Sequence, residues 1–331
     1  MLDIQTSAPG KVIVTGEYAV LEGAPAVCMA VDRRAHVSIN SSDNEFHSVF
    51  APGYSETVGR FRADETGIEW VDGGDDYGLF ATVWRKVAAM PSECLNIVLD
   101  SNEFVDVESS SKIGIGSSAA LTVALTAALD IVAGGDRSIH RVAAAAHSEY
   151  QGGAGSGADV ACSLAGGVIE YRMGNEPDRA LRWPDGLAYA LLWSGVSANT
   201  RDKLKKLAQT DAGSTNDELV TEAEAVASAW HDHTASDIIA AVRSYTSSLR
   251  RFDDAHALGI FEAGHAELAS RAASCGVVYK PCGAGGGDIG IAIANDAAAI
   301  EAFVATASDS DFKHLRMTIE PTGLRRDGDQ L

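Results

Sequence analysis

The chain has 331 residues, of which 46% are hydrophobic, and a formal net charge of -20. This length and apolar content are enough to bury a large core, and they predict a globular protein with two domains. Nucleic acids and anionic membranes attract basic surfaces, so the strong negative charge argues against either as a partner. Positive contacts to an anionic substrate must therefore be local.

The five cysteines are dispersed, odd in number and without a CxxC pair. Such a set is typical of reduced core thiols rather than of a disulfide framework. The first residues lack a basic run followed by an apolar core, and no apolar stretch reaches bilayer-spanning length. We therefore expect a cytoplasmic location, no membrane contact, small-molecule partners, and a monomer or a homodimer.

The first half of the chain alternates strand-like and helical patterns. Short β-branched runs over residues 4–40 predict antiparallel strands with tight connections at Gly10 and Gly23. Residues 41–76 are polar and acidic, which predicts a loop or hairpin region. The elements expected next are a helix at 79–89, strands at 95–101 and 103–109, a buried helix at 118–132, a helix over 138–150 capped by Ser138, and a structured loop leading into a short helix over 151–167.

The second half is mainly helical. The expected elements are strands at 168–172 and 187–193, helices over 200–275 with breaks near 211–214 and 234–236, a strand, glycine loop and strand over 276–295, a helix from its cap Asp296 to about Ser308, and an edge strand at 314–323. This order predicts an α+β protein. We place one domain at residues 1–175 and a second at residues 176–331.

The stretch KIGIGSSAA, residues 112–120, is the first candidate for ligand binding. Gly114 and Gly116 let the backbone approach a ligand closely, and Ser117 and Ser118 lie where the first unpaired amides of a helix point outward. Phosphate suits such a helix start. The alternative is an ordinary strand-to-helix turn, since the spacing matches neither the Walker A motif nor G-x-G-x-x-G.

Two further positions combine a loop with an ionisable group. Asp159 follows the loop glycines of GSGADVA and could act as a general base, or it could merely stabilise the short helix that follows. Lys11, in an expected turn between strands, could neutralise charge on a transferring phosphoryl group, or it could be an exposed turn lysine.

A third glycine loop lies in KPCGAGGGDIG, residues 280–290. Its four glycines within five positions would destabilise a purely structural turn, which favours close approach to a ligand or to the first loop. Asp288 at its end could simply close the loop by hydrogen bonding to the backbone.

The segments SAPGKVIVTGEYAVLEG, KIGIGSSAA and KPCGAGGGDIG occur in this order between residues 7 and 290. Together they resemble the three signature motifs of the GHMP small-molecule kinases. Within that superfamily, QGGAGSGADVA and WSGVSANTRD look most like segments of the phosphomevalonate kinases. Mevalonate kinases, related decarboxylases and a non-catalytic nucleotide-binding regulator remain as alternatives. One departure is Ser110, at a position where the superfamily often has proline.

The resemblance implies the GHMP kinase fold: a half similar to domain 2 of ribosomal protein S5, then a ferredoxin-like helical half, with ATP and Mg²⁺ in the cleft between them. It implies that Asp159 orients or deprotonates the acceptor and that Lys11 stabilises the transferred charge. The implied ATP-binding residues are Gly114, Gly116, Ser117, Ser118 and Ala119. The implied acceptor-binding residues are Glu17, Tyr18, Lys112, Ser156, Gly157, Ser197, Arg201, Gly283, Ala284 and Gly285. The implied metal ligands are Ser118 and Glu149.

Overall fold

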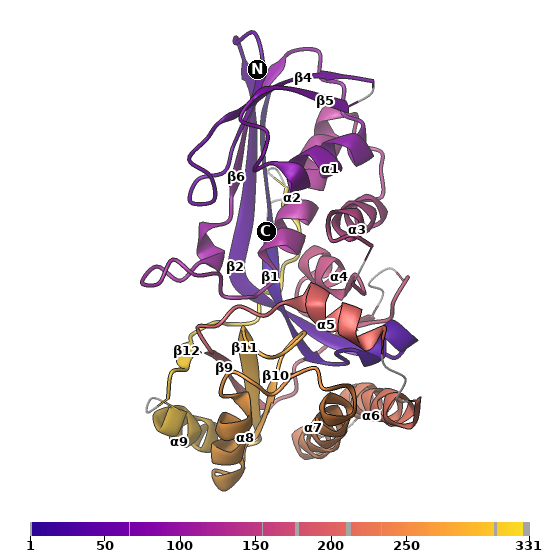
Figure 1. Cartoon of the computed structure of the whole chain (residues 1–331), viewed down its shortest axis with the longest axis vertical. Helices are drawn as coiled ribbons and strands as arrows, with labels where there is room; N and C mark the ends of the chain where they lie inside the picture. Colours follow the sequence, from indigo (N-terminus) through magenta and orange to yellow (C-terminus); the bar gives the residue numbers. More distant parts are fainter. Residues whose placement is uncertain are drawn as a thin grey trace.

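The structure is a computed structural model that describes residues 2–65, 67–153, 155–175, 179–209, 213–232, 234–307 and 310–326. Its strands form two sheets, and helices pack on both (Figure 1). The predicted α+β class is therefore confirmed.

The larger sheet is built around two long antiparallel strands, β1 (Asp3–Thr15) and β2 (Ala26–Ser42). A single turn of 3-10 helix, η1 (Ala19–Glu22), joins them and ends at Gly23 with φ 86°, so the connection predicted at Gly23 is confirmed. The strand order is β13-β1-β2-β6-β3-β4-β5, with β7 beside β2 and β8 beside β7. The remaining strands of this sheet are β3 (His47–Phe50), β4 (Gly59–Asp64), β5 (Gly67–Asp72), β6 (Cys94–Asp100), β7 (Val168–Tyr171), β8 (Arg179–Leu181) and β13 (Arg325–Arg326).

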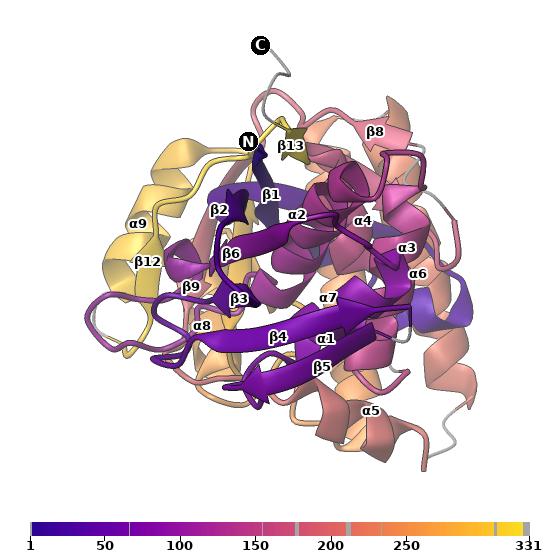
Figure 2. The ribbon, with the colours of Figure 1, turned by 90° about the horizontal axis from the view of Figure 1, so that it is seen from above.

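Four helices pack beside this sheet (Figure 2). They are α1 (Gly78–Val87), α2 (Ser117–Val132), α3 (Ile139–Tyr150) and α4 (Ala158–Ala165). The alanine- and leucine-rich α2 contacts β1, β2 and the other three helices, which explains why its pattern is apolar nearly all round. The predicted cap is confirmed at α3, where the Ser138 hydroxyl accepts the Arg141 N–H at 3.4 Å.

The second half contains an antiparallel sheet in the order β10-β11-β9-β12. Its strands are β9 (Ala188–Trp193), β10 (Val278–Pro281), β11 (Ile289–Ala294) and β12 (Lys313–Leu315), and its helices are α5 (Thr200–Leu207), α6 (Gly213–Asp232), α7 (Ala235–His256), α8 (His265–Ser274) and α9 (Ala297–Ala307). Neighbouring residues on β9 enter different cores: Leu192 packs with residues of α8 and α9, whereas Leu191 joins the main core with the first half. None of the helices in the described ranges is long and apolar enough to cross a bilayer.

Most predicted boundaries in this half hold. The break near residues 234–236 is confirmed between α6 and α7, and Asp296 accepts the Ala298 N–H at 2.9 Å before α9. The break predicted near 211–214 lies partly outside the described residues, as does Ser308. The edge strand predicted at 314–323 is much shorter, because only Lys313–Leu315 pair with β9.

Three expectations about local structure are wrong. Gly10 is not in a turn but inside β1, where β2 carries two extra residues between Val31 and Arg34. Residues 103–109 are not a strand, because the 3-10 helix η2 (Asn102–Phe104) leads into turns. The helical run over 200–275 also breaks after α7, where Ala257 adopts φ 50° and the chain turns into α8.

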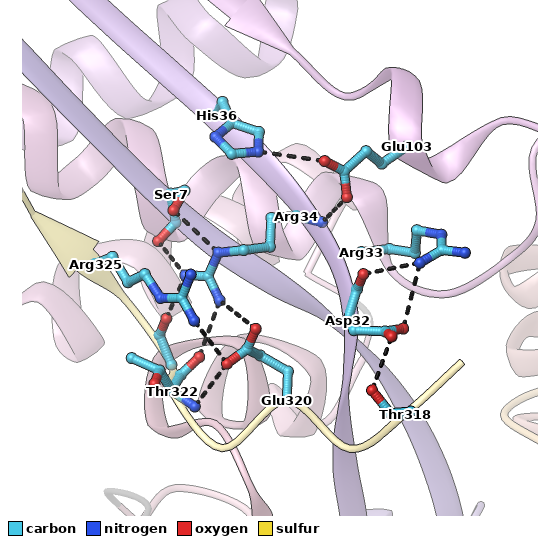
Figure 3. A network of polar contacts seen from close by, with 11 residues as sticks. Ser7, Asp32, Arg33, Arg34, His36, Glu103, Thr318, Glu320, Thr322 and Arg325 are labelled. Carbon is cyan, nitrogen blue, oxygen red and sulfur yellow. Dashed lines mark hydrogen bonds and ion pairs between the residues drawn. The ribbon is translucent and has the colours of Figure 1, made fainter. Parts of the chain in front are cut away.

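The end of the described chain returns to the first half, where buried Arg34 holds it (Figure 3). The Arg34 guanidinium donates to the carbonyl oxygens of Ser7, Thr322 and Gly323 at 2.9, 3.0 and 2.6 Å, and forms an ion pair with Glu320 at 3.6 Å. Next to these contacts, β13 pairs with β1. The domain division at residue 175 stays a prediction, but the first sheet also takes in β8 and β13 from the second half of the sequence.

Candidate active site

A cleft of about 410 Å³ brings the three glycine-rich segments together. Its walls come from the β1–η1 region, the start of α2, the start of α4, the 194–200 segment and the loop between β10 and β11. The lining residues among those predicted are Lys11, Glu17, Tyr18, Lys112, Gly114, Gly116, Ser117, Ser118, Ser156, Asp159, Ser197, Gly283 and Ala284. Segments far apart in sequence thus share one cavity.

Two helices begin at this cleft, and each begins after a glycine in the left-handed region. Gly116 precedes α2 with φ 81°, and Gly157 precedes α4 with φ 83°. The first amides of a helix have no partner within the helix, so those of Ser117, Ser118 and Ala119 are available to an anion. Ala119 can contribute only its backbone, because its side chain is fully buried.

Lys11 lies beside the first glycine loop, residues 112–120. Its backbone N–H donates to the Ile115 carbonyl at 2.8 Å, and its side chain passes over Gly116, where an added Cβ would lie 2.9 Å from Lys11 Cε. Gly10 permits this contact, since a Cβ there would lie 2.9 Å from the same Ile115 oxygen. Lys11 is therefore bonded to the first glycine loop through its backbone and lies over that loop with its side chain. The alternative of an exposed turn lysine does not describe it.

Asp159 lies in the first turn of α4 with one carboxylate oxygen used locally. Its Oδ1 accepts the Val160 N–H at 3.0 Å. Asp159 thus bonds a backbone amide at the start of the short helix, as the structural alternative for this residue expects. Its Oδ2 lies 3.8 Å from Nδ1 of His147, and its side chain is 23% exposed. The carboxylate is therefore open to the cleft as well as anchored.

Asp288 connects the third loop to the first. A Cβ on Gly114 would lie 2.3 Å from Asp288 Cγ, so Gly114 is needed for this close approach. Asp288 Oδ1 accepts the Ala198 N–H at 3.2 Å, and the Asp288 N–H donates to the Val196 carbonyl at 2.6 Å. Burial raises the pKa of this carboxyl above its ordinary value. These two hydrogen bonds connect Asp288 to the 196–198 segment rather than to the backbone of its own loop, and they lie on either side of Ser197.

Glu17 and Tyr18 line the cleft in a different manner from the one expected. The Glu17 carboxylate forms a buried ion pair with Lys280 and accepts the Tyr245 hydroxyl at 3.0 Å, so it is committed to the protein interior. Tyr18 adopts φ 61° and donates its hydroxyl to the Ala284 carbonyl at 2.7 Å. Both residues therefore brace the third loop.

Five predicted residues are not among those that line the cleft: Ala119, Glu149, Gly157, Arg201 and Gly285. Glu149 forms ion pairs with Arg85 and Lys86 instead. Arg201 donates to the Tyr150 carbonyl at 2.9 Å and is not among the lining residues. Gly285 packs on Ile260, whose side chain would lie 2.5 Å from an added Cβ.

Ser156 and Gly157 shape the start of α4. The Ser156 hydroxyl accepts the Ala158 N–H at 3.3 Å, and its carbonyl accepts the Tyr171 hydroxyl at 2.7 Å. Ser110, at the position where proline is common in the superfamily, adopts φ 55°. Proline cannot reach this conformation, which explains the departure.

A second cavity of about 80 Å³ adjoins the cleft and was not predicted from the sequence. The two cavities share Lys112, Ser117, Ser118 and Tyr150. Its other walls are largely apolar and aromatic: Ala51, Tyr54, Tyr77, Leu79, Phe80, Leu99, Leu121 and Leu125. The Lys112 ammonium lies 5.3 Å from the centre of the Tyr54 ring, at the junction of the two spaces.

Comparison with known proteins agrees with this geometry. Residues 82–167 match the family model of the GHMP kinases N terminal domain. A phosphomevalonate kinase from a Streptomyces species is 29% identical, over 96% of this chain and 94% of its own length. A mevalonate kinase from Thermococcus sibiricus is 30% identical, over 62% of this chain and 61% of its own.

Solved structures share the fold. The Streptococcus pneumoniae phosphomevalonate kinase, in complex with phosphomevalonate and AMPPNP, has a TM-score of 0.78 at 18% identity and covers 96% of this chain and 100% of its own. The Methanococcus jannaschii mevalonate kinase has a TM-score of 0.73 at 16% identity, over 96% and 98% of the two chains. The expected GHMP kinase fold is confirmed.

A glycine loop at a helix start, with a lysine and a carboxylate in the same cleft, agrees with the class of small-molecule kinases to which the comparisons point. The chain is therefore a kinase that carries the N terminal domain of the GHMP kinases at residues 82–167, and it is similar to a phosphomevalonate kinase over 96% of its length.

Proposed function

We propose that this protein transfers the γ-phosphoryl group of ATP to the phosphate of (R)-5-phosphomevalonate, giving the 5-diphosphate and ADP. The observation that carries the proposal is the meeting of Lys11, Asp159 and the start of α2 in one cleft. The choice of acceptor rests on length of similarity. The phosphomevalonate kinase from a Streptomyces species matches 96% of the chain, whereas the mevalonate kinase from Thermococcus sibiricus matches 62%.

In this mechanism the start of α2 holds the phosphates of the nucleotide, and Lys11 neutralises charge that develops on the transferred group. Asp159 orients the attacking oxygen of the acceptor and takes its proton where it carries one. The attack forms a bond to the γ-phosphorus and breaks the bond to the β-γ bridging oxygen, which leaves with ADP.

The second cavity suits the base of the nucleotide. Its lining is mainly apolar and aromatic, with Asp76 and Ser101 as further polar groups, and it joins the cleft at Ser117 and Ser118. A bound nucleotide could therefore place its base there and its phosphates at α2. Lys112, at the junction, is the cation we assign to the phosphates or to the acceptor.

Mg²⁺ fits this site as an ion held mainly by the nucleotide. It takes oxygen ligands and often binds through few protein groups plus substrate phosphates. The described residues contain no cluster of three or more His, Cys, Asp or Glu side chains suited to a metal. Ser118 lines the cleft and is our candidate ligand, whereas Glu149 is withdrawn from it by Arg85 and Lys86. Bound there, the ion would offset phosphate charge.

The acceptor assignment is tested with purified protein, ATP and Mg²⁺, by following ADP release with phosphomevalonate, mevalonate and mevalonate diphosphate in parallel. We expect turnover of phosphomevalonate. Turnover of mevalonate alone would make the protein a mevalonate kinase, and nucleotide binding without turnover of any acceptor would favour a regulator.

The Asp159→Asn variant tests the carboxylate. We expect kcat to fall by about 10²- to 10⁴-fold, the typical contribution of a positioned acid or base, while ATP still binds. The matched control is Asp136→Asn, because Asp136 is a surface carboxylate with 85% side-chain exposure. Near-normal turnover by Asp159→Asn would remove Asp159 from this role.

A further inference from the structure

His147 lies where three helix ends meet. It is in the last turn of α3 and is 2% exposed, next to Ser118 in the first turn of α2 and Asp159 in the first turn of α4. Its Nε2 lies 3.0 Å from Ser118 Oγ, and its Nδ1 lies 3.8 Å from Asp159 Oδ2. One buried imidazole therefore contacts both a phosphate-loop hydroxyl and the carboxylate that faces the acceptor.

These neighbours determine which ring nitrogen carries the proton. An ionised carboxylate only accepts hydrogen bonds, so the nitrogen facing Asp159, Nδ1, is the one with a proton to offer. On the other side, Nε2 lies 3.3 Å from the side-chain amide nitrogen of Gln151. An amide nitrogen only donates, so Nε2 is an acceptor whose single lone pair is shared by the Ser118 hydroxyl at 3.0 Å and the more distant Gln151 amide.

We propose that His147, as its Nδ1–H tautomer, is a positioning residue that orients the Ser118 hydroxyl and the Asp159 carboxylate for phosphoryl transfer. This inference rests on the proposed function. Because Nε2 accepts a hydrogen bond from the Ser118 hydroxyl, the lone pairs of that oxygen stay available to the phosphates and their cation. The Nδ1–H attracts Oδ2 of Asp159, while the Val160 N–H holds Oδ1. Both oxygens of the carboxylate thereby have a fixed direction.

A buried histidine that only fills space would also pack between α2, α3 and α4. Two substitutions separate this possibility from positioning. An asparagine places an amide nitrogen near the former Nδ1 and keeps a donor toward Asp159. A glutamine places an amide oxygen near the former Nε2 and keeps an acceptor for Ser118.

The experiment measures nucleotide affinity by calorimetry, and kcat and the nucleotide KM with the acceptor that the wild type turns over. For His147→Asn we expect nucleotide affinity to fall about five- to tenfold, the worth of one hydrogen bond, with a smaller change in kcat. For His147→Gln we expect kcat to fall by a similar factor while nucleotide affinity stays within about twofold of wild type. The control is His314→Gln, because His314 is exposed on β12, and it should match wild type.

Nitrogen-15 chemical shifts of the imidazole test the tautomer without substitution of the ring and without turnover. We expect a protonated Nδ1 and an unprotonated Nε2, with the Nε2 signal shifted by Ser118→Ala. A proton on Nε2 alone would overturn the proposal, and so would equal effects of the two variants on affinity and kcat. If the wild type turned over no acceptor, the proposed function would fail, while calorimetry and the nitrogen shifts would still test the contacts of His147.

Discussion

The buried ion pair between Lys280 and Glu17 joins the two halves behind the cleft, and its removal yields a sharp prediction. Lys280 is fully buried on β10, and its ammonium contacts the Glu17 carboxylate and the Val14 carbonyl, the latter at 3.0 Å. In Lys280→Met, Glu17 would keep its hydrogen bond from Tyr245 but lose its counter-charge while 2% exposed. Stranding a buried charge costs about 3–5 kcal/mol.

That loss is a large share of the stability of an ordinary domain, which is about 5–15 kcal/mol. Urea unfolding followed by tryptophan fluorescence measures it directly. The double variant Lys280→Met with Glu17→Gln removes the stranded charge, and we expect it to recover at least about 2 kcal/mol relative to the single variant. Arg182→Met, which removes the exposed ion pair between Arg182 and Asp185, serves as the control and should change stability much less.

Two results would refute this reasoning. One is a loss below about 1 kcal/mol in the single variant, which would mean that the unpaired carboxylate is readily solvated or protonated. The other is a double variant no more stable than the single, which would mean that packing around the Lys280 chain, rather than charge, sets the cost.

Further predictions concern a glycine, a histidine and an arginine. Gly114→Ala should weaken nucleotide binding and destabilise the fold by about 1–3 kcal/mol, because the added Cβ would meet Asp288. Gly135→Ala is the control for backbone strain, since Gly135 has a similar positive φ but open space around it. Burial lowers the pKa of His265 to about 4. In the unfolded chain this histidine binds its proton near pH 6.5. The free energy of unfolding of the wild type, relative to that of His265→Gln, should therefore fall by about 3 kcal/mol as the pH drops from 7 to 4. If this difference stayed the same, His265 would not have a lowered pKa. Arg34→Met should cost about 3 kcal/mol and speed hydrogen exchange over residues 318–326; unchanged exchange there would show that the segment is held by other contacts.

Much of the fold follows from local pattern, and its failures have local causes. The apolar α2 and the caps Ser138 and Asp296 were predictable because each depends on residues close in sequence. Gly10 was misread as a turn because glycine marks both turns and close backbone approach. Only the distant Ile115 decides between them here.

The candidate site was predictable where a residue belongs to a short sequence motif. It was not predictable where the role of a residue depends on which face of a helix points toward the cleft. Glu149 was expected to bind metal, but an α-helix turns by about 200° over two residues. His147 therefore faces the cleft side while Glu149 faces Arg85. Which face points inward depends on how α3 packs on α1, α2 and α4, and the short motif does not contain that information.

The return of residues 318–326 to the first sheet sets the order in which this chain can fold. Arg326 pairs with Thr6, so the strand beside the N-terminus is synthesised after nearly every other element. A nascent first half would carry an incomplete sheet, and Arg34 would lack the carbonyls of Thr322 and Gly323, until the second half had emerged. Because such distant pairings form slowly, we expect refolding of the whole protein to be a single late closure rather than the docking of two finished domains.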